Sequence, residues 1–541
     1  MKNKQKNDII DAYPLSKMQS GMYFHYATTQ EQVLYHDIFN LRIASSWQSE
    51  AFQSAVSTLL EKHIALRTSF EFTKFSQPVQ LVHKQGIVRF SELDPDCADD
   101  QSFDVYVETQ IANIEDSPFD LAKQSLIRFT VIRKNDREFQ LLVDAHHMIL
   151  DGWSMASLLT ELFQNYLANI GVIAAPPSTL SAASFKDFIR SEIEEVARGE
   201  SAKYWQQYLA EHEHKSFSFA PTSGSGKVQN LRAVIPTNNH ALNNIAQHQK
   251  TSLKEVLMAA HLRVVAYIQG TTKAASTYVS NGRPETLGGD TVAGLFLNVL
   301  PIHVDIHQLS WSALISQVNQ MQTAAMRYRR FPFAEMVQNH GNGISDIHFN
   351  FVHFHVYKAV QGIDQFQIQA GEIRERSNFP LAVTFHLGVS GELELLLRYR
   401  DNVLSEQDAQ RVLAYYLKSI ANLAAYPEAL CTEHPLYSPQ EDRALHQSNE
   451  TSRTYKSELA VHEQITEQVL KRADAVALRC GESTVNYSEL LSGAQCIAGF
   501  LQSQGVGRGD LVGICMGRGI TLLMSILGVL KSGAGYVPFS D

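Results

Sequence analysis

The sequence predicts a mixed α/β (α+β) protein made of several structural units, and three observations support this. Its 541 residues exceed the roughly 100–200 residues of a single domain. Patterns typical of strands and of helices alternate along the chain, and the character of the sequence changes after the mid-400s. Hydrophobic residues make up 44% and charged residues 19%, which is ordinary for a globular protein with large cores.

In the first half, apolar residues fall on one side of a helix predicted over residues 51–62. Residues 126–132 and 138–145 are expected to form two strands around a polar turn at 133–137. Asp151 then precedes a run with apolar residues on one face. We therefore expect Asp151 to cap a helix there.

The second half repeats this mixture. Helices are predicted over residues 251–268 and 405–423, and a strand over residues 274–280 ends in the turn NGRPE. Residues 171–184 are small and contain proline, so they are expected to separate the two halves. Residues 426–455 are rich in Pro, Ser, Glu and Asn without periodicity and predict a linker.

Several classes of protein are disfavoured by composition. A net charge of −10 argues against a nucleic-acid partner, since such proteins are usually basic. The five cysteines form no CxxC pair, so disulfides and zinc are not expected and a reducing compartment fits. No apolar run follows the charged N-terminus, and the longest apolar stretch, 520–530, is shorter than the about 18 residues of a membrane span. We expect a cytoplasmic protein.

The segment that carries chemistry is HHMILDG at residues 146–152. His147 follows a predicted strand, where a turn can expose its imidazole to a cleft. A histidine near the attacking amine of an acyl transfer can orient it, accept its proton, or stabilise the tetrahedral intermediate. We expect Asp151 to lock the turn through a cation such as Arg67, and Gly152 to let substrate approach the backbone.

Two other interpretations of the motif remain open at this point. His146 and His147 could bind a metal with Asp151 as the third ligand. Either histidine could instead be structural, and we favour this for His146, because neighbouring residues on a strand face opposite sides.

The chain resembles the condensation domains of nonribosomal peptide synthetases over roughly residues 10–430. Seven segments match the motifs of that family in order. They are YPLSKMQSGMYFH at 13–25, KHIALRTSF at 62–70, HHMILDGWS at 146–154, the helical segment at 185–188 with Tyr204 and Trp205, GLFLNVLPIHV at 294–304, RFPFAE at 330–335 and SNFPL at 377–381.

The resemblance implies two chloramphenicol-acetyltransferase-like lobes in a V shape, over residues 1–178 and 179–430. A tunnel between them would admit a carrier arm from either side, with His147 midway. It implies His147, His146, Asp151 and Gly152 as catalytic residues and Arg67 as structural support that pairs with Asp151. Tunnel residues would be Trp153, Ser154, Asn298 and Ser377.

The implied reaction is transfer of an acyl or peptidyl group from a donor carrier thioester to the amine of an acceptor aminoacyl carrier. Donor and acceptor carrier proteins would be the partners, and their phosphopantetheine arms would deliver the substrates. No directly bound cofactor or metal is expected. An ester-forming acyltransferase and a non-catalytic carrier-docking domain are the alternatives. An epimerisation domain, which shares the motif, is disfavoured by the domain order.

Four positions depart from the pattern of the resembled family. Val299 and His303 stand where Thr and Arg are usual, and Lys17 and Ser20 where Pro and Glu are common. If the usual arginine supports the lobe interface or the tunnel, His303 would retune it. None of the four lies in the HHxxxDG motif, so we do not infer inactivity.

After a linker at residues 431–456, residues 457–541 resemble the beginning of an adenylation domain. VNYSEL at 485–490 and LKSGAGYVPFSD at 530–541 match its first two motifs. The ATP-binding motifs would lie after residue 541, so this incomplete α/β segment is not expected to activate an amino acid by itself.

Overall fold

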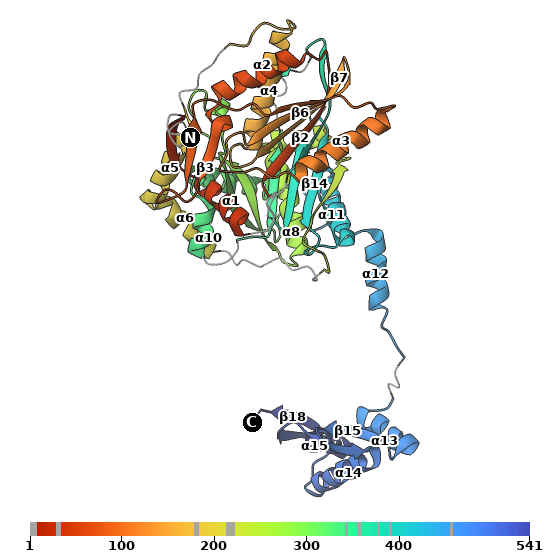
Figure 1. Cartoon of the computed structure of the whole chain (residues 1–541). Helices are drawn as coiled ribbons and strands as arrows, with labels where there is room; N and C mark the ends of the chain where they lie inside the picture. Colours follow the sequence, from red (N-terminus) through yellow and green to blue (C-terminus); the bar gives the residue numbers. More distant parts are fainter. Residues whose placement is uncertain are drawn as a thin grey trace. The chain divides into compact units, whose positions relative to one another are not determined.

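The computed structural model describes residues 8–28, 34–177, 183–211, 222–340, 344–353, 359–360, 362–375, 379–388, 391–454 and 458–540. The chain divides into two compact units, Met1–Ser438 and Pro439–Asp541 (Figure 1). The larger unit contains two large sheets, and the smaller unit has its own helices and strands.

The first large sheet of unit 1 has the strand order β12-β2-β7-β6-β5. These strands are β2 (His36–Ser45), β5 (Phe90–Leu93), β6 (Ile127–Asn135), β7 (Glu138–His146) and β12 (Phe366–Arg374). The predicted strand pair is β6 and β7, but β6 extends to Asn135, so only Asp136 and Arg137 of the predicted turn lie between the strands. Strand alternation sends Leu41, Leu141 and Val143 to one face and Ile38 and Leu142 to the other.

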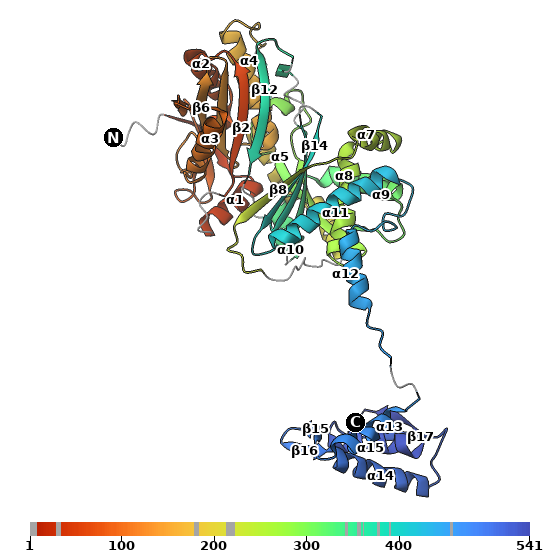
Figure 2. The same ribbon diagram turned by 90° about the vertical axis from the view of Figure 1, so that its right-hand side faces the viewer.

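Each face of this sheet is covered by helices. The face with Leu41 packs against α2 (Ser49–Lys62) and α4 (Gly152–Asn169), whose apolar stripes lie in the same core. The opposite face packs against Phe103, Val107 and Ile111 of α3 (Asp100–Glu115). Figure 2 shows these helices on either side of the sheet. The predicted helix at 51–62 is thus α2.

A small antiparallel sheet, ordered β1-β4-β3, adjoins this core. It consists of β1 (Ile9–Pro14), β3 (Thr68–Glu71) and β4 (Val79–His83), and β1 leads into α1 (Lys17–Thr28). Gln19 of α1 is fully buried, and its amide donates to the carbonyl of Met148 at 2.7 Å. The opening segment of the chain therefore braces the HHMILDG turn.

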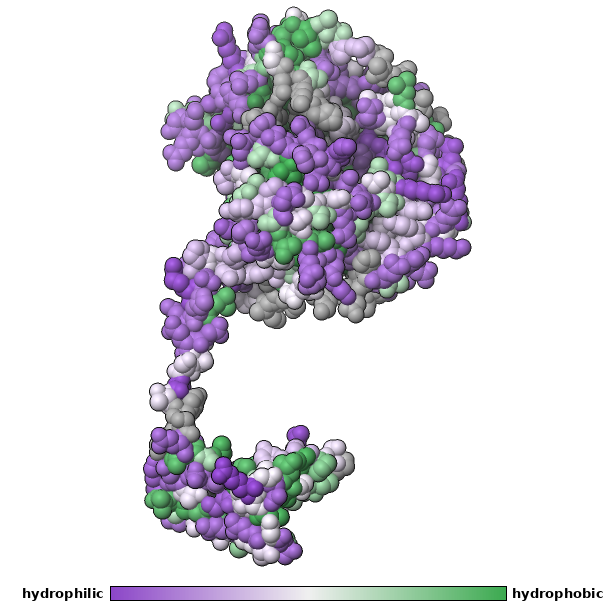
Figure 3. Space-filling model, turned by 180° about the vertical axis from the view of Figure 1, so that it is seen from behind, coloured by the Kyte–Doolittle hydropathy of each residue, from purple (hydrophilic) through white to green (hydrophobic). Residues whose placement is uncertain are grey.

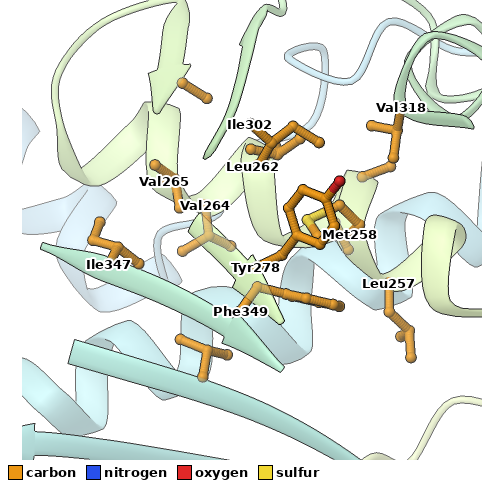
Figure 4. Packing of buried hydrophobic residues seen from close by; sticks show 14 of the residues in the cluster. Leu257, Met258, Leu262, Val264, Val265, Tyr278, Ile302, Val318, Ile347 and Phe349 are labelled. Carbon is orange, nitrogen blue, oxygen red and sulfur yellow. The ribbon is translucent and has the colours of Figure 1, made fainter. Parts of the chain in front are cut away.

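The second large sheet has the order β10-β9-β11-β13-β14-β8. Its members are β8 (Val228–Val234), β9 (Lys273–Asn281), β10 (Leu297–Asp305), β11 (Ile347–Val352), β13 (Leu381–Leu387) and β14 (Leu393–Arg400). One face packs against α8 (Leu253–Ile268), α9 (Trp311–Ala325) and α11 (Glu406–Ala425). Figure 4 shows Met258 and Leu262 of α8 in this core beside Tyr278 and Ile302 of the sheet.

The two halves of unit 1 are interleaved. Strand β12 lies after residue 179, yet it pairs antiparallel with β2 over Phe366 to Arg374 and forms the edge of the first sheet. Phe185 and Phe188 of α5 (Phe185–Arg198) and residues 293–296 also pack in the first core. A division of the sequence near residue 178 therefore does not separate the two cores.

Two parts of the predicted linker have a defined structure, residues 431–436 and residues 439–449. Cys431 and Leu436 are 1% and 2% exposed and belong to the core of the second sheet. Residues 439–449, expected to be irregular, form helix α12 (Pro439–Asn449), in which no residue is buried. Because α12 has no buried face, its sequence lacks the apolar stripe by which helices are recognised.

Unit 2 has helices α13 (Val461–Arg472), α14 (Tyr487–Ser503) and α15 (Ile520–Ser532). Strands β15 (Val476–Cys480) and β16 (Ser483–Asn486) form a hairpin, while β17 (Leu511–Cys515) and β18 (Gly535–Phe539) pair in parallel. Helix α15 connects β17 to β18 and contains the longest apolar stretch of the chain, residues 520–530. Leu470, Leu511 and Phe539 are 85%, 73% and 60% exposed, and Figure 3 shows hydrophobic side chains on the surface of this unit.

In the part of the chain that the structure describes, no helix combines the length and the apolar character that crossing a bilayer requires.

Candidate active site

The HHMILDG turn joins the end of β7 to the beginning of α4. His146 is the last residue of β7, and Asp151 is the N-cap of α4, as predicted. The backbone N–H of His147 donates to the carbonyl of Tyr35 at 2.7 Å. Tyr35 has a left-handed backbone (φ 63°), an uncommon conformation for a bulky residue. The turn is thus fixed at both ends and at its centre.

His147 pairs with a carboxylate that the sequence did not single out. Its Nδ1 lies 3.0 Å from Oδ2 of Asp37 on β2, and the two side chains are 20% and 11% exposed. Burial alone would lower the pKa of His147, but the negative charge of Asp37, with contributions from Glu375 and Asp151, outweighs it and raises the pKa to about 9. The nearby carboxylate of Asp37 therefore favours the charged form of the His147 ring.

His146 points the other way, as strand alternation predicts. It is 2% exposed, and its Nδ1 accepts from the N–H of Met148 at 3.2 Å. Its ring lies edge-on to Phe119 with 6.4 Å between centroids. Burial, reinforced by the neighbouring His36, lowers the pKa of His146 to about 3, so this ring is neutral and packs inside the protein.

Asp151 ties the turn to two other segments. Its Oδ1 accepts from the N–H of Ser154 at 2.7 Å, and its Oδ2 accepts from the N–H of Phe296 at 3.0 Å. Nη2 of Arg283 lies 2.7 Å from Oδ1, and the two side chains are 6% and 0% exposed. The carboxylate is fully engaged in holding the turn.

The predicted pairing of Arg67 with Asp151 is wrong. Arg67 donates instead to the backbone carbonyls of His83, Lys84 and Glu61 at 2.9, 3.1 and 3.3 Å. Its guanidinium joins β4 to the end of α2, where unpaired carbonyls need donors. Arg67 is structural support, but for a different part of the lobe.

Arg283, the true partner, lies in the NGRPE turn after β9. Besides Asp151, its guanidinium donates to the hydroxyl of Ser154 at 2.6 Å and to the carbonyl of Val292 at 2.5 Å. It also stacks over the ring of Phe296, 4.4 Å from the centroid. The sequence showed an arginine in this turn, but nothing local indicated a buried carboxylate facing it.

The other predicted site residues lie around these contacts. Gly152 is the first residue of α4. Trp153 donates its indole N–H to the carbonyl of Asp290 at 3.0 Å, and Ser154 donates to the carbonyl of Gly294 at 2.7 Å. Asn298 donates to the carbonyls of Arg329 and Phe331 at 2.8 and 2.7 Å and so holds the RFPFAE segment.

Ser377, the remaining predicted tunnel residue, lies outside the described residues. Among the described residues, no group of three His, Cys, Asp or Glu side chains is arranged to hold a metal ion. Asp151, the third ligand in the metal interpretation, turns to Arg283.

The departures at Lys17 and His303 have partners of their own. Nζ of Lys17 lies 2.6 Å from Oε1 of Glu335, and its backbone N–H donates to Glu192 at 2.8 Å. His303 is 4% exposed on β10, and the centroid of its ring lies 5.6 Å from that of Tyr208. Both contacts join segments that are far apart in sequence.

Comparison with known proteins identifies the family. Residues 9–446 match the family model described as "Condensation domain", and residues 465–541 match the model described as "AMP-binding enzyme". The chain belongs to the condensation-domain family, with a short AMP-binding segment after the condensation domain. This confirms the predicted resemblance, and members of this family are typically acyltransferases that form peptide bonds.

Two relatives illustrate the similarity. The chain is 24% identical over 548 residues to bacitracin synthase 1 of Bacillus licheniformis, and the match covers 97% of this chain and 10% of that protein. It is 28% identical over 429 residues to AMB antimetabolite synthetase AmbE of Pseudomonas aeruginosa, over 77% of this chain and 20% of the relative. The chain thus spans a small part of the length of these relatives.

Solved structures confirm the predicted fold. The four-domain nonribosomal peptide synthetase holo-AB3403 superposes with a TM-score of 0.68 at 18% identity, over 99% of this chain and 42% of that one. The first condensation domain of the calcium-dependent antibiotic synthetase superposes with a TM-score of 0.67 at 15% identity, over 80% of this chain and all of that domain.

Proposed function

We propose that this chain forms an amide bond by moving an acyl or peptidyl group from a donor carrier thioester to the amine of an acceptor aminoacyl carrier. The observation that carries the proposal is His147 on a braced turn, paired with Asp37, in a chain of the condensation-domain family. The C–S bond of the thioester breaks and a C–N bond forms. The amine proton ends on the departing thiolate.

The charge on His147 favours one of the roles open to it. With a pKa of about 9, the ring already holds a proton at neutral pH and is a poor acceptor for the proton of the amine. Its Nδ1 faces Asp37, so Nε2–H is the donor left for substrate. We infer that this N–H orients the thioester carbonyl and stabilises the negative oxygen of the tetrahedral intermediate.

The surrounding residues position this donor. Asp37 fixes the ring and its charge, while Asp151 and Arg283 hold the turn, and we assign His146 a packing role. Trp153, Ser154, Asn298 and Ser377 remain proposed for the tunnel, and Gly152 for the close approach of substrate to the backbone. Trp153, Ser154 and Asn298 use their polar groups for hydrogen bonds within the protein, so they would contribute to the shape of the tunnel. The phosphopantetheine arms of donor and acceptor carrier proteins would bring in the substrates.

Mass spectrometry of the acceptor carrier tests the proposal. The chain is mixed with donor-loaded and acceptor-loaded carriers, using a panel of acyl, L-aminoacyl and D-aminoacyl donors. His147→Ala is compared with His307→Ala, a matched change of an exposed histidine. We expect a product joined to the acceptor that is lost only in His147→Ala.

The other outcomes separate the alternatives. Product formed only with a hydroxyl acceptor would indicate an ester-forming acyltransferase. Carrier binding by the folded protein without any product would indicate a docking domain. Product that survives His147→Ala would contradict the role of this residue.

A further inference from the structure

A cavity of about 400 Å³ lies where the first and second sheets of unit 1 face each other. Its wall is formed by β2 and β12 of the first sheet, the end of α3, and β8 and β14 of the second sheet. Most of the side chains that line it are polar or charged. They include Arg232, Glu372, Arg374, Glu375 and Arg398, with His36 at the first sheet.

The cavity comes close to the active site at the end of β12. Arg374 pairs in register with Ile38, so the next residue of the chain, Glu375, lies across from Asp37, the partner of His147. Glu375 lines the cavity, and its charge is among those that raise the pKa of His147. His36 and Ile38 line it from the face of β2 opposite to that of Asp37. A group bound in the cavity would therefore lie near a molecule bound at His147.

Arg398 is the distinctive member of this wall. It is 4% exposed and extends from β14 on the side of the sheet away from the apolar core. Nη1 lies 3.2 Å from Oε2 of Glu375, and Nε donates to Oδ1 of Asn230 at 3.3 Å. Within the described residues, its Nη2 has no hydrogen-bond partner, so a nearly buried guanidinium keeps donors for a ligand.

The other two arginines of the wall differ in how far they are engaged. Arg374 contacts both carboxylate oxygens of Glu108 at 2.9 Å and also Glu372 at 3.2 Å. Arg232 has only distant carboxylates, Glu372 and Glu394, each at 3.8 Å. Arg398 and Arg232 therefore keep guanidinium donors that the described acceptors do not fully engage, and the buried Nδ1 of His36 in the same wall also has no hydrogen-bond partner among the described residues.

We propose that this cavity binds an anionic side chain of one of the two thioester substrates, a carboxylate such as that of an aspartyl group, with Arg398 as the specificity-determining residue. The planar guanidinium matches a carboxylate with two parallel hydrogen bonds. An alkyl chain would fill the cavity without satisfying these charges, which is unfavourable. The proposal rests on the proposed condensation function.

The test uses matched substrates. Aspartyl, asparaginyl and leucyl groups are offered on carrier thioesters, first as donor and then as acceptor, to the intact chain. We expect aspartyl to be favoured over asparaginyl at one position by about tenfold to a hundredfold, the range for loss of a charged hydrogen bond. Arg398→Gln should abolish that preference, and Arg411→Gln, on the exposed surface of α11, should keep it.

A second measurement does not depend on turnover or on the variant folding. Non-hydrolysable thioether analogues of the same three aminoacyl pantetheines are titrated into the wild-type chain by calorimetry. Tighter binding of the aspartyl analogue than of the asparaginyl one supports the proposal, even if no condensation occurs and the proposed function fails. Equal binding of the three analogues, or a preference for aspartyl that survives in folded Arg398→Gln, would overturn it.

Discussion

The ion pair between Arg283 and Asp151 should be one of the strongest single contacts in unit 1. Both side chains are almost completely buried, so solvent does not screen the pair. Removing one partner leaves the other charge buried and unpaired, which costs about 3–5 kcal/mol. We therefore expect Arg283→Gln to lower the free energy of unfolding of unit 1 by that amount and to slow condensation by loosening the HHMILDG turn.

A double-mutant cycle can show that Asp151 is coupled energetically to Arg283 and not to Arg67. All four tryptophans, Trp47, Trp153, Trp205 and Trp311, lie in unit 1, so their fluorescence during urea unfolding reports on that unit. Arg283→Gln and Asp151→Asn should be non-additive by about 1–3 kcal/mol. Arg67→Gln and Asp151→Asn share no partner and should be additive within about 0.5 kcal/mol. Additivity of the first pair, or strong coupling in the second, would refute the reasoning.

Two further predictions concern residues that join distant segments. Burial raises the pKa of Glu192 from 4.5 to about 7. Ionisation of Glu192 therefore lowers the free energy of unfolding as pH rises from about 4.5 to 7, by about 3 kcal/mol once the carboxyl is fully ionised. Glu192→Gln keeps the acceptor for the N–H of Lys17 and should raise the unfolding midpoint at pH 8 but hardly at pH 4.5; an equal gain at both would contradict this. At Gly294, an added Cβ would lie 2.7 Å from the Phe185 ring and 2.9 Å from the Phe296 ring. Gly294→Ala should therefore cost about 1–3 kcal/mol in the same urea assay. Gly21→Ala on α1, where an added Cβ meets no atom within 4 Å and the backbone is not left-handed, controls for the loss of glycine; an equal loss in both variants would contradict the crowding at Gly294.

Local patterns predicted the elements that carry the motif. The strand pair β6 and β7, the cap at Asp151 and the helix α4 follow from alternation, turn residues and apolar spacing within about forty residues. Helix α8 and strand β9 in the second half were predicted for the same reason. The opposite orientation of His146 and His147 also follows from strand geometry.

Contacts between distant segments could not be predicted in this way. Arg283 and Asp151 are 132 residues apart. From the sequence alone, either Arg67 or Arg283 could be the cation that pairs with Asp151. Asp37 is one charged residue at the start of an apolar strand, and only the pairing of β2 with β7 brings it to His147. Strand β12 joins the first sheet from the second half, and no local pattern states which sheet a strand will join.

We propose that Asp37 holds His147 as a cation at the candidate site of acyl transfer. The most direct test is a pH titration of the His147 ring by NMR in the intact chain, with the resonance assigned by its absence in His147→Gln. We predict a pKa near 9, so the stabilisation from this ion pair is complete below pH 6.5 and is lost as pH rises through 9. In Asp37→Asn, where burial remains and the partner charge is gone, the pKa should fall markedly. A His147 ring that titrates at or below 6.5 in the wild-type chain would contradict the account and would favour a neutral imidazole that accepts the proton of the amine.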